Sequence, residues 1–128
     1  MKKIVHTSLA PAPIGPYNQA VWANNLLFLS GQIAINPETS ELVLDDLNKE
    51  THQVMRNIQA ILTSQSLSFN DVVKCSIFLS DMNDFGQVNE IYGSYFQSDN
   101  APARETVEVA CLPKNVNVEI SVIACKQD

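Results

Sequence analysis

Two segments of the chain place apolar residues three and four positions apart, which is the spacing of an amphipathic helix. The first extends from about residue 46 to residue 67, and the second follows a helix-capping residue at Asp81 or Asn83. Each predicted helix buries one stripe of side chains. The first stripe is Leu47, Thr51, Val54, Ile58, Ile61 and Leu62, with Met55 at its edge, and the second is Phe85, Val88, Tyr92 and Tyr95, flanked by Ile91 and Phe96.

Six other segments have the alternating or continuous apolar pattern of β-strands. Asn24-Asn25 is a turn signal that joins two of them as a hairpin, and the second strand of this pair is apolar enough to be buried on both faces. The predicted strands are a short one near Ile4 and those at about 17–23, 26–30, 72–79, within 102–113 and from 116 to 122. In the strand at 72–79, the residues expected to face the core are Val73, Cys75, Ile77 and Leu79.

The order of these elements predicts an α+β fold, in which two helices pack on one face of a mixed sheet of about six strands. A chain of 128 residues has the size of one domain, so we assign residues 1–128 to a single domain. The other sheet face would mix polar and apolar residues, and a partner subunit usually covers such a face. We therefore expect an oligomer. The residues assigned to the uncovered face are Ser76, Phe78, Thr106, Glu108, Ser121 and Ile123.

The chain is acidic, with 8 Lys and Arg residues against 14 Asp and Glu residues and a formal net charge of −6. No basic cluster is larger than Lys2-Lys3, so nonspecific binding to nucleic acid is disfavoured. Cys75, Cys111 and Cys125 have no CxxC spacing and lie in apolar strand patterns, which predicts reduced core thiols in a cytoplasmic protein. No stretch approaches the roughly 20 apolar residues that span a bilayer.

Several common catalytic motifs are missing from the sequence. The two histidines, His6 and His52, lie far apart, so we expect no histidine metal site and no catalytic triad. The 4 glycines form no phosphate-binding loop. Chemistry must therefore come from Arg, Glu, Tyr, Asn, Ser and backbone groups, a set that suits carboxylate binding combined with water activation or proton transfer.

Arg104 begins one strand-patterned run, and Glu119 lies in the next run, after the short turn at 113–115. The apolar face of the first run contains Val107 and Val109. If the turn makes a hairpin and both apolar faces enter one core, Arg104 and Glu119 emerge on the same side of the sheet, whatever the register. Because arginine grips a carboxylate at two points, the pair would hold opposite ends of a small anionic substrate.

Each of these two residues also has an ordinary structural interpretation. Arg104 would then make a salt bridge at the end of its strand. Glu119 would make a cross-strand ion pair with Arg104 or Lys114, and this is compatible with a second role in positioning water.

Three further polar or flexible positions are equally open on pattern alone. Tyr17 would cap the proline-rich loop at 10–16, and Asn89 would be a surface residue on a helix edge. Gly31 follows Ser30 and marks a strand end, a bulge or the close approach of a ligand.

Four separated segments, which span nearly the whole chain, match the motifs of one family in order. They are residues 14–20 (IGPYNQA), 29–33 (LSGQI), 83–89 (NDFGQVN) and 102–113 (PARETVEVACLP), followed by Glu119. In these segments the chain resembles the Rid (YjgF/YER057c/UK114) family of enamine/imine deaminases. The resemblance implies a chorismate-mutase-like α+β fold, assembled as a homotrimer whose sheets pack into a central barrel with active clefts between subunits.

The resemblance also implies a reaction, a form of metabolite damage control. Reactive 2-aminoacrylate and related enamines and imines, released by pyridoxal-phosphate enzymes acting on serine or threonine, are hydrolysed to 2-oxo acids and ammonia, and the enzyme itself needs no cofactor. Arg104 corresponds to the residue that holds the substrate carboxylate, and Glu119 to the one that positions or activates the attacking water. The further pocket residues carried over are Tyr17, Ser30, Gly31, Asn89 and Thr106.

Two residues differ from the family pattern. Glu105 stands where a small or hydroxyl residue is usual, and Cys111 stands where arginine is common. Strand alternation should turn Glu105 away from Arg104, which predicts that substrate binding survives.

Two other functions compete with deamination. A non-catalytic module could hold a 2-oxo acid or another small carboxylate in the same cleft, but binding alone requires Arg104 and not Glu119. An endoribonuclease or translation inhibitor, an activity reported for some family members, is opposed by the net charge of −6 and by the lack of a catalytic histidine pair. We expect a small carboxylate substrate, with no membrane and no nucleic acid as partner.

Overall fold

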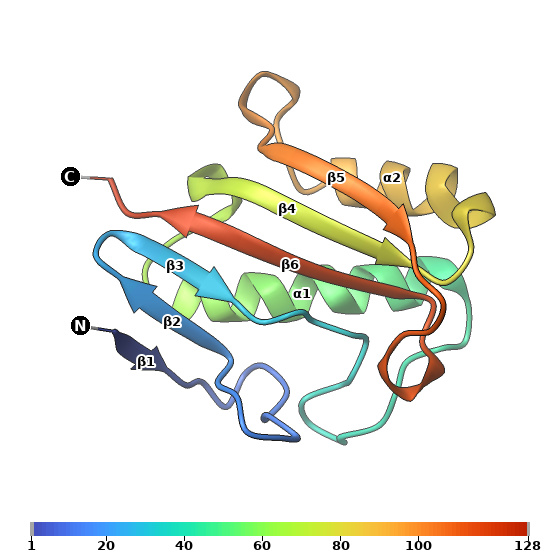
Figure 1. The fold of residues 1–128 in the computed structure, drawn as a ribbon, viewed down its shortest axis with the longest axis horizontal. Coiled ribbons are helices and arrows are strands. Elements are labelled where there is room, and N and C mark those ends of the chain that lie inside the picture. The colour runs from blue at the N-terminus through green and yellow to red at the C-terminus, as the bar shows by residue number, and fades with distance from the viewer. Residues whose placement is uncertain (1, 128) are drawn as a thin grey trace.

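The computed structural model describes residues 2–127, in which two helices lie on one side of a six-stranded sheet (Figure 1). The strand order is β1-β2-β3-β6-β4-β5, and all neighbours are antiparallel except the parallel pair β4 and β5. The predicted α+β architecture is confirmed. The elements are β1 (Lys3–Val5), β2 (Ala20–Ala23), β3 (Leu26–Leu29), α1 (Leu47–Ser64), β4 (Val72–Leu79), α2 (Phe85–Gly93), β5 (Ala103–Glu108) and β6 (Val118–Cys125).

The main core fills the space between the sheet and the two helices. The predicted stripe of α1 is buried there, with Leu47 partly buried at its N-terminal end. In β6 every second side chain, from Val118 to Ala124, is buried against the helices. No helix within residues 2–127 is long and apolar enough to cross a membrane.

Two strand predictions are wrong in detail. The strand at 26–30 is not buried on both faces, because Phe28 is 37% exposed on the side away from the helices. In β4, Val73 is 45% exposed, whereas Val72 is buried. A register shift between Val72 and Lys74 reverses the alternation at this end of β4, which the apolar pattern alone does not reveal.

The predicted hairpin through residues 113–115 is also wrong. β4 lies between β5 and β6, so the chain leaving β5 crosses the end of β4 before it enters β6 (Figure 1). Val107 faces the side without helices and is 41% exposed, whereas Arg104 pairs with the buried Cys75 of β4 and so faces the helix side. Because β5 is an edge strand, its helix side meets only the flank of α2 and accepts polar residues.

The sheet face without helices, called the open face below, combines apolar and polar rows. The registers place Ile4, Val21, Phe28 and Ile123 in one row across four strands. Ser76, Phe78, Ser121 and Ile123 lie on this face as predicted, but Thr106 and Glu108 lie on the helix side instead, opposite Ile77 and Leu79. The open face is therefore at least as apolar as the sequence indicated.

Candidate functional site

The seven residues predicted for the site separate into two groups on opposite faces of the sheet. Glu119 pairs with Phe78 and therefore faces the open side, where it adjoins the loops that follow β1 and β3. Arg104 faces α2. The prediction that Arg104 and Glu119 share one side is wrong within a single chain. The open-side group is Tyr17, Ser30, Gly31 and Glu119, and the helix-side group is Asn89, Arg104 and Thr106.

Glu119 lies over Gly31, and this contact requires a glycine. A Cβ atom added at Gly31 would stand 2.8 Å from Cδ and 3.1 Å from Cγ of Glu119. The backbone angle φ of Gly31 is not positive, so an added side chain is opposed by the Glu119 side chain in its present place and not by the backbone conformation. Of the three alternatives at Gly31, the strand end holds, since β3 ends at Leu29, and the group that approaches Gly31 closely is the Glu119 side chain.

A small pocket with mostly apolar walls surrounds this carboxylate. Ile14, Tyr17, Gly31 and Pro113 line it together with Glu119. Burial raises the pKa of the Glu119 carboxyl above its ordinary value. Within residues 2–127 no side chain pairs with this carboxylate, so the alternative of an ion pair with Arg104 or Lys114 does not hold in the isolated chain. An unpaired carboxylate of this kind is a better base than an ordinary exposed glutamate.

The proline-rich loop reaches the pocket because Gln19 holds it in place. Sequence analysis missed this residue, whose side chain is only 2% exposed. Its amide donates to the carbonyls of Thr7, Ala10 and Pro11, and its carbonyl oxygen accepts from the main chain of Thr7. A glutamine that follows a proline-rich loop carries no sequence signal that distinguishes it from a surface residue.

Two local hydrogen bonds complete this half of the site. The Tyr17 hydroxyl accepts from the Ile14 amide at 3.3 Å, which keeps the ring against the loop, as the capping interpretation predicted. The Ser30 hydroxyl donates to the carbonyl of Asn18 at 2.6 Å. Ser30 is therefore already bonded to the main chain and lines the pocket beside Gly31.

Arg104 is oriented by three residues of α2. Its Nη1 donates to Oδ1 of Asn89 at 2.6 Å. The guanidinium carbon lies 5.1 Å from the ring centroid of Tyr92 and 5.6 Å from that of Phe85, within cation–π range. Among the residues described, no carboxylate forms an ion pair with Arg104, so the salt-bridge interpretation fails and the remaining donors of an exposed guanidinium are available to an anion.

Two polar atoms beside Arg104 are buried without a partner in residues 2–127, namely the hydroxyl oxygens of Thr106 and Tyr92. Cys75 of β4 pairs with Arg104 and lies close to Tyr92, and burial raises the pKa of its thiol to about 11. At neutral pH this thiol stays protonated and is a poor nucleophile.

The three cysteines are reduced, but only Cys75 is a core residue as predicted. Cys111 is exposed and Cys125 is half-buried. Cys111 follows the end of β5, where the chain has left the sheet, so its position in an apolar run does not lead to burial.

Glu105 points away from Arg104, as the strand alternation predicted. It forms an ion pair with Lys74 at 2.9 Å and accepts a hydrogen bond from Ser76 on the open face. These two contacts hold the pKa of its carboxyl below the ordinary value. Within residues 2–127, no group of three or more His, Cys, Asp or Glu side chains is arranged to hold a metal ion.

Known proteins resemble this chain over nearly its full length. The family model described as endoribonuclease L-PSP matches residues 7–126. A RutC family protein of Pyrococcus horikoshii is 50% identical over 99% of this chain and 100% of its own length. A mouse protein named 2-iminobutanoate/2-iminopropanoate deaminase is 44% identical over 97% of this chain and 91% of its own length. The crystal structure of a Yersinia pestis protein of the Rid family, whose function is unknown, superposes with a TM-score of 0.95 at 47% identity and covers 98% of this chain and 100% of that one.

Proposed function

The chain belongs to the Rid (YjgF) family, whose model is described as endoribonuclease L-PSP, and on this premise we propose that it is an enamine/imine deaminase. Its substrates are 2-aminoacrylate-type intermediates released by pyridoxal-phosphate-dependent serine or threonine dehydratases, and its products are 2-oxo acids and ammonia. The 44% identity to the mouse 2-iminobutanoate/2-iminopropanoate deaminase supports this reaction class.

The observation that carries the proposal is a pair of complementary charged groups, neither of which has an oppositely charged partner within residues 2–127. Arg104 is held by Asn89 and two aromatic rings but has no carboxylate partner in the part of the chain described. Glu119 is a partly buried carboxylate with a raised pKa in an apolar pocket. A substrate with a carboxylate at one end and an electrophilic carbon at the other uses both groups.

We place the two groups in one cleft by combining two copies of the chain. Because Arg104 and Glu119 lie on opposite faces of one sheet, a single chain does not bring them to the same substrate. The apolar row on the open face supports contact with another copy. The assembly we propose is a homotrimer, with Arg104 and Asn89 from one subunit facing Tyr17, Gly31 and Glu119 of its neighbour.

In this cleft the chemistry requires only an oriented water. Arg104 holds the substrate carboxylate, which fixes the neighbouring iminium carbon. Glu119 accepts a proton as the water oxygen bonds to that carbon, and the C=N electron pair moves to nitrogen. Glu119 then returns this proton to the nitrogen, and the C–N bond breaks as the new hydroxyl group loses its own proton to Glu119, which releases ammonia and leaves the carbonyl of the 2-oxo acid. A carboxylate whose pKa is raised by burial is suited to these proton transfers.

A ribonuclease activity is the competing function, because the family model carries that description. The net charge of −6 opposes binding to a phosphate backbone. Of the two histidines, His52 forms a hydrogen bond of 2.8 Å with the Tyr95 hydroxyl, and both residues are distant from Glu119 in the sequence. A binding module without turnover is the other alternative, and it leaves the pocket around Glu119 without a role.

A coupled assay tests the proposal directly. A serine or threonine dehydratase generates the imine, and 2-oxo acid formation is followed with and without this protein. We expect wild-type protein to accelerate 2-oxo acid formation and the Arg104→Lys variant not to accelerate it. Equal rates with and without wild-type protein would eliminate the deaminase, and RNA cleavage by the same preparation would favour the ribonuclease.

Mixed assemblies test whether the cleft combines two chains. Arg104→Lys and Glu119→Gln should each be inactive alone. In oligomers assembled from equal amounts of both variants, a cleft between subunits has both wild-type residues in about a quarter of cases. Recovery of about a quarter of the wild-type activity supports the shared cleft, and no recovery would mean that each site lies within one chain.

A further inference from the structure

Glu50, in the first turn of α1, is a fully buried carboxylate. Its relative exposure is 0%, and no cation within residues 2–127 forms an ion pair with it. A buried carboxylate without a cation is costly unless hydrogen bonds compensate for the lost water. The position of Glu50 at a helix N-terminus helps, because the helix dipole favours negative charge there.

Three N–H groups of the segment that leads into β6 satisfy this carboxylate. Oε2 accepts from the main-chain amides of Asn117, at 2.8 Å, and Val118, at 3.2 Å. Oε1 accepts from the side-chain amide of Asn117 at 2.7 Å. The residue that follows Asn117 and Val118 is Glu119, so two of these bonds hold the main chain immediately before the proposed base and the third holds the Asn117 side chain.

The main chain just after Glu119 is fixed as well. Ile120 and Gln32 exchange two backbone hydrogen bonds, of 2.8 and 3.1 Å, which bring Gly31 beneath the Glu119 side chain. Besides the pairing of β6 with β4, in which Glu119 lies opposite Phe78, Glu119 therefore lies between two further anchors, one made by Glu50 and one made by Gln32. The first anchor is the only one of the two that depends on a side chain.

We propose that Glu50 is a positioning residue for Glu119. Its carboxylate fixes Asn117 and Val118 and so determines where the Glu119 carboxylate sits above Gly31 and in the pocket. The kinetic part of this inference rests on the proposed deaminase function. The claim that Glu50 fixes the position of the Glu119 side chain does not depend on what reaction the protein catalyses.

The decisive variant is Glu50→Leu, which keeps most of the side-chain volume and removes both acceptor oxygens, and with them all three hydrogen bonds. We expect kcat to fall on the order of 10²-fold with a much smaller change in KM, because Glu119 is displaced while Arg104 still binds the substrate. Glu50→Gln should retain most of the activity. Its oxygen can accept from both main-chain amides, and the Asn117 side chain can turn its own oxygen toward the new amide.

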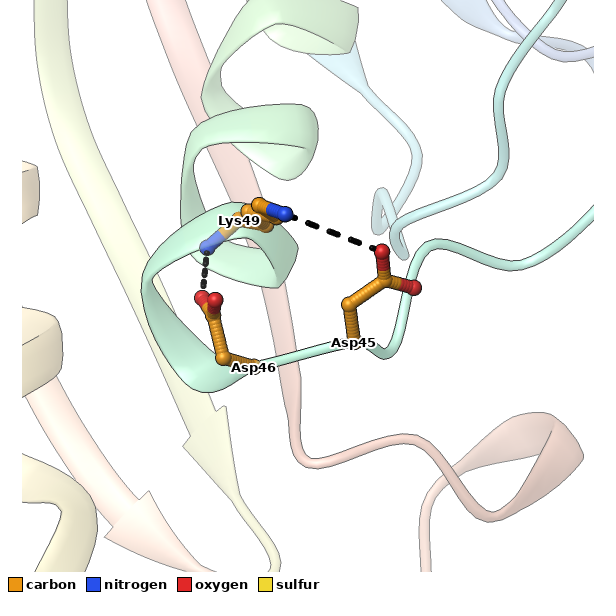
Figure 2. Close-up of polar contacts among 3 residues, drawn as sticks. All are labelled: Asp45, Asp46 and Lys49. Atoms are coloured by element: carbon orange, nitrogen blue, oxygen red, sulfur yellow. Dashed lines mark hydrogen bonds and ion pairs between the residues drawn. The ribbon is translucent and has the colours of Figure 1, made fainter.

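Asp46→Ala is the matched control at the same end of α1. The Asp46 side chain caps the helix by accepting from the Lys49 amide at 2.7 Å, and Lys49 also pairs with Asp45 at 3.8 Å (Figure 2). This variant weakens the helix start without touching β6. It should lower the melting temperature and leave kcat within about twofold of wild type.

A spectroscopic measurement separates positioning from a loss of stability. Carboxyl-carbon NMR follows the titration of Glu119, and Tyr17 is the only other titratable residue that lines its pocket. Burial raises the pKa of Glu119 in the wild type. We expect that pKa to return toward the ordinary value in Glu50→Leu, in which the side chain gains access to water, and to stay raised in Asp46→Ala.

The kinetic and NMR results test the role of Glu50 separately from the proposed deaminase function. If wild-type protein does not hydrolyse the imine, the proposed function fails and the titration of Glu119 still tests Glu50. If Glu50→Leu does not fold, Glu50→Asp is the second variant. Its shorter side chain withdraws the carboxylate by about 1.5 Å from the amides of Asn117 and Val118. We expect this variant to have a kcat about tenfold below that of wild type. A folded Glu50→Leu or Glu50→Asp protein with wild-type kcat and an unchanged Glu119 pKa would overturn the inference.

Discussion

Gly31→Ala is the substitution that most directly tests the placement of Glu119. The added Cβ would lie 2.8 Å from Cδ and 3.1 Å from Cγ of Glu119. Carbon atoms in ordinary contact are about 3.5–4.0 Å apart. The Glu119 side chain must therefore retreat by about 0.7–1.2 Å, which is the difference between that contact distance and the first of these separations.

Such a displacement is large for a group that must orient a water molecule. A misplacement of about 1 Å costs on the order of 10²-fold in rate, which corresponds to about 2.7 kcal/mol in the activation barrier. We expect the loss in kcat, since Arg104 lies on the other face of the sheet and its contacts are unchanged. The coupled dehydratase assay measures kcat and KM directly.

The fold should tolerate the same substitution. The φ angle of Gly31 is not positive, and replacing glycine by alanine at such a position stabilises a protein by about 0.4–1 kcal/mol through the unfolded state. Forcing one side chain off its preferred rotamer costs about 0.5–1.5 kcal/mol, so the two effects nearly cancel. The melting temperature should stay within about 5 °C of the wild-type value.

Gly93→Ala is the control, because an added Cβ at Gly93 has no atom within 4 Å. It should keep wild-type kcat. If Gly31→Ala is as active as Gly93→Ala, then Glu119 either is not held above Gly31 or is not needed where it sits. A Gly31→Ala protein that fails to fold would contradict the argument that only a flexible side chain has to move.

Three further substitutions test the other parts of the site. Arg104→Lys should lower kcat/KM on the order of 10²-fold or more with an unchanged melting temperature, because lysine keeps the charge but loses the two-point grip; near wild-type turnover would remove Arg104 from the mechanism. Glu119→Gln should abolish turnover while 2-oxo acid affinity, measured by calorimetry, is retained. Because burial raises the pKa of Glu119 in the folded state, its ionisation destabilises the fold as the pH rises through this raised pKa. The melting temperature of Glu119→Gln should therefore exceed that of wild type at pH 8, and the difference should vanish below pH 4.5, the ordinary pKa of the group. Ser121→Arg places a charge on the open face and should dissociate the oligomer and remove activity together; light scattering that shows a monomeric, fully active wild type would refute the shared cleft.

Much of the fold follows from local patterns in the sequence. The three-to-four spacing in α1 buries the stripe that the sequence indicated, because a helix of this length has one face against the sheet. The alternation in β6 likewise matches its burial at every second residue. Alternation also turned Glu105 away from Arg104 correctly, since neighbours on one strand always face opposite sides.

The relation between Arg104 and Glu119 depended on information that is not local. Two consecutive runs of strand pattern suggested a hairpin, but β4, which lies earlier in the chain, pairs with both and separates them. Which strand β5 and β6 pair with depends on the path of residues 109–117, which connect them, and on which strands the helices cover. Nothing in the apolar period of β5 or β6 encodes that choice.

The element types, the two-layer architecture and the residue types available for chemistry were predictable from the sequence, because they follow from periodicity and from side-chain charge and shape. Which of these groups meet depends on the tertiary structure. It put the guanidinium of Arg104 against Asn89, Glu119 above Gly31, and the amides of Asn117 on Glu50, a contact 67 residues apart along the chain. Contacts between distant segments depend on strand order and burial, and these are properties of the whole packed chain and not of any local stretch.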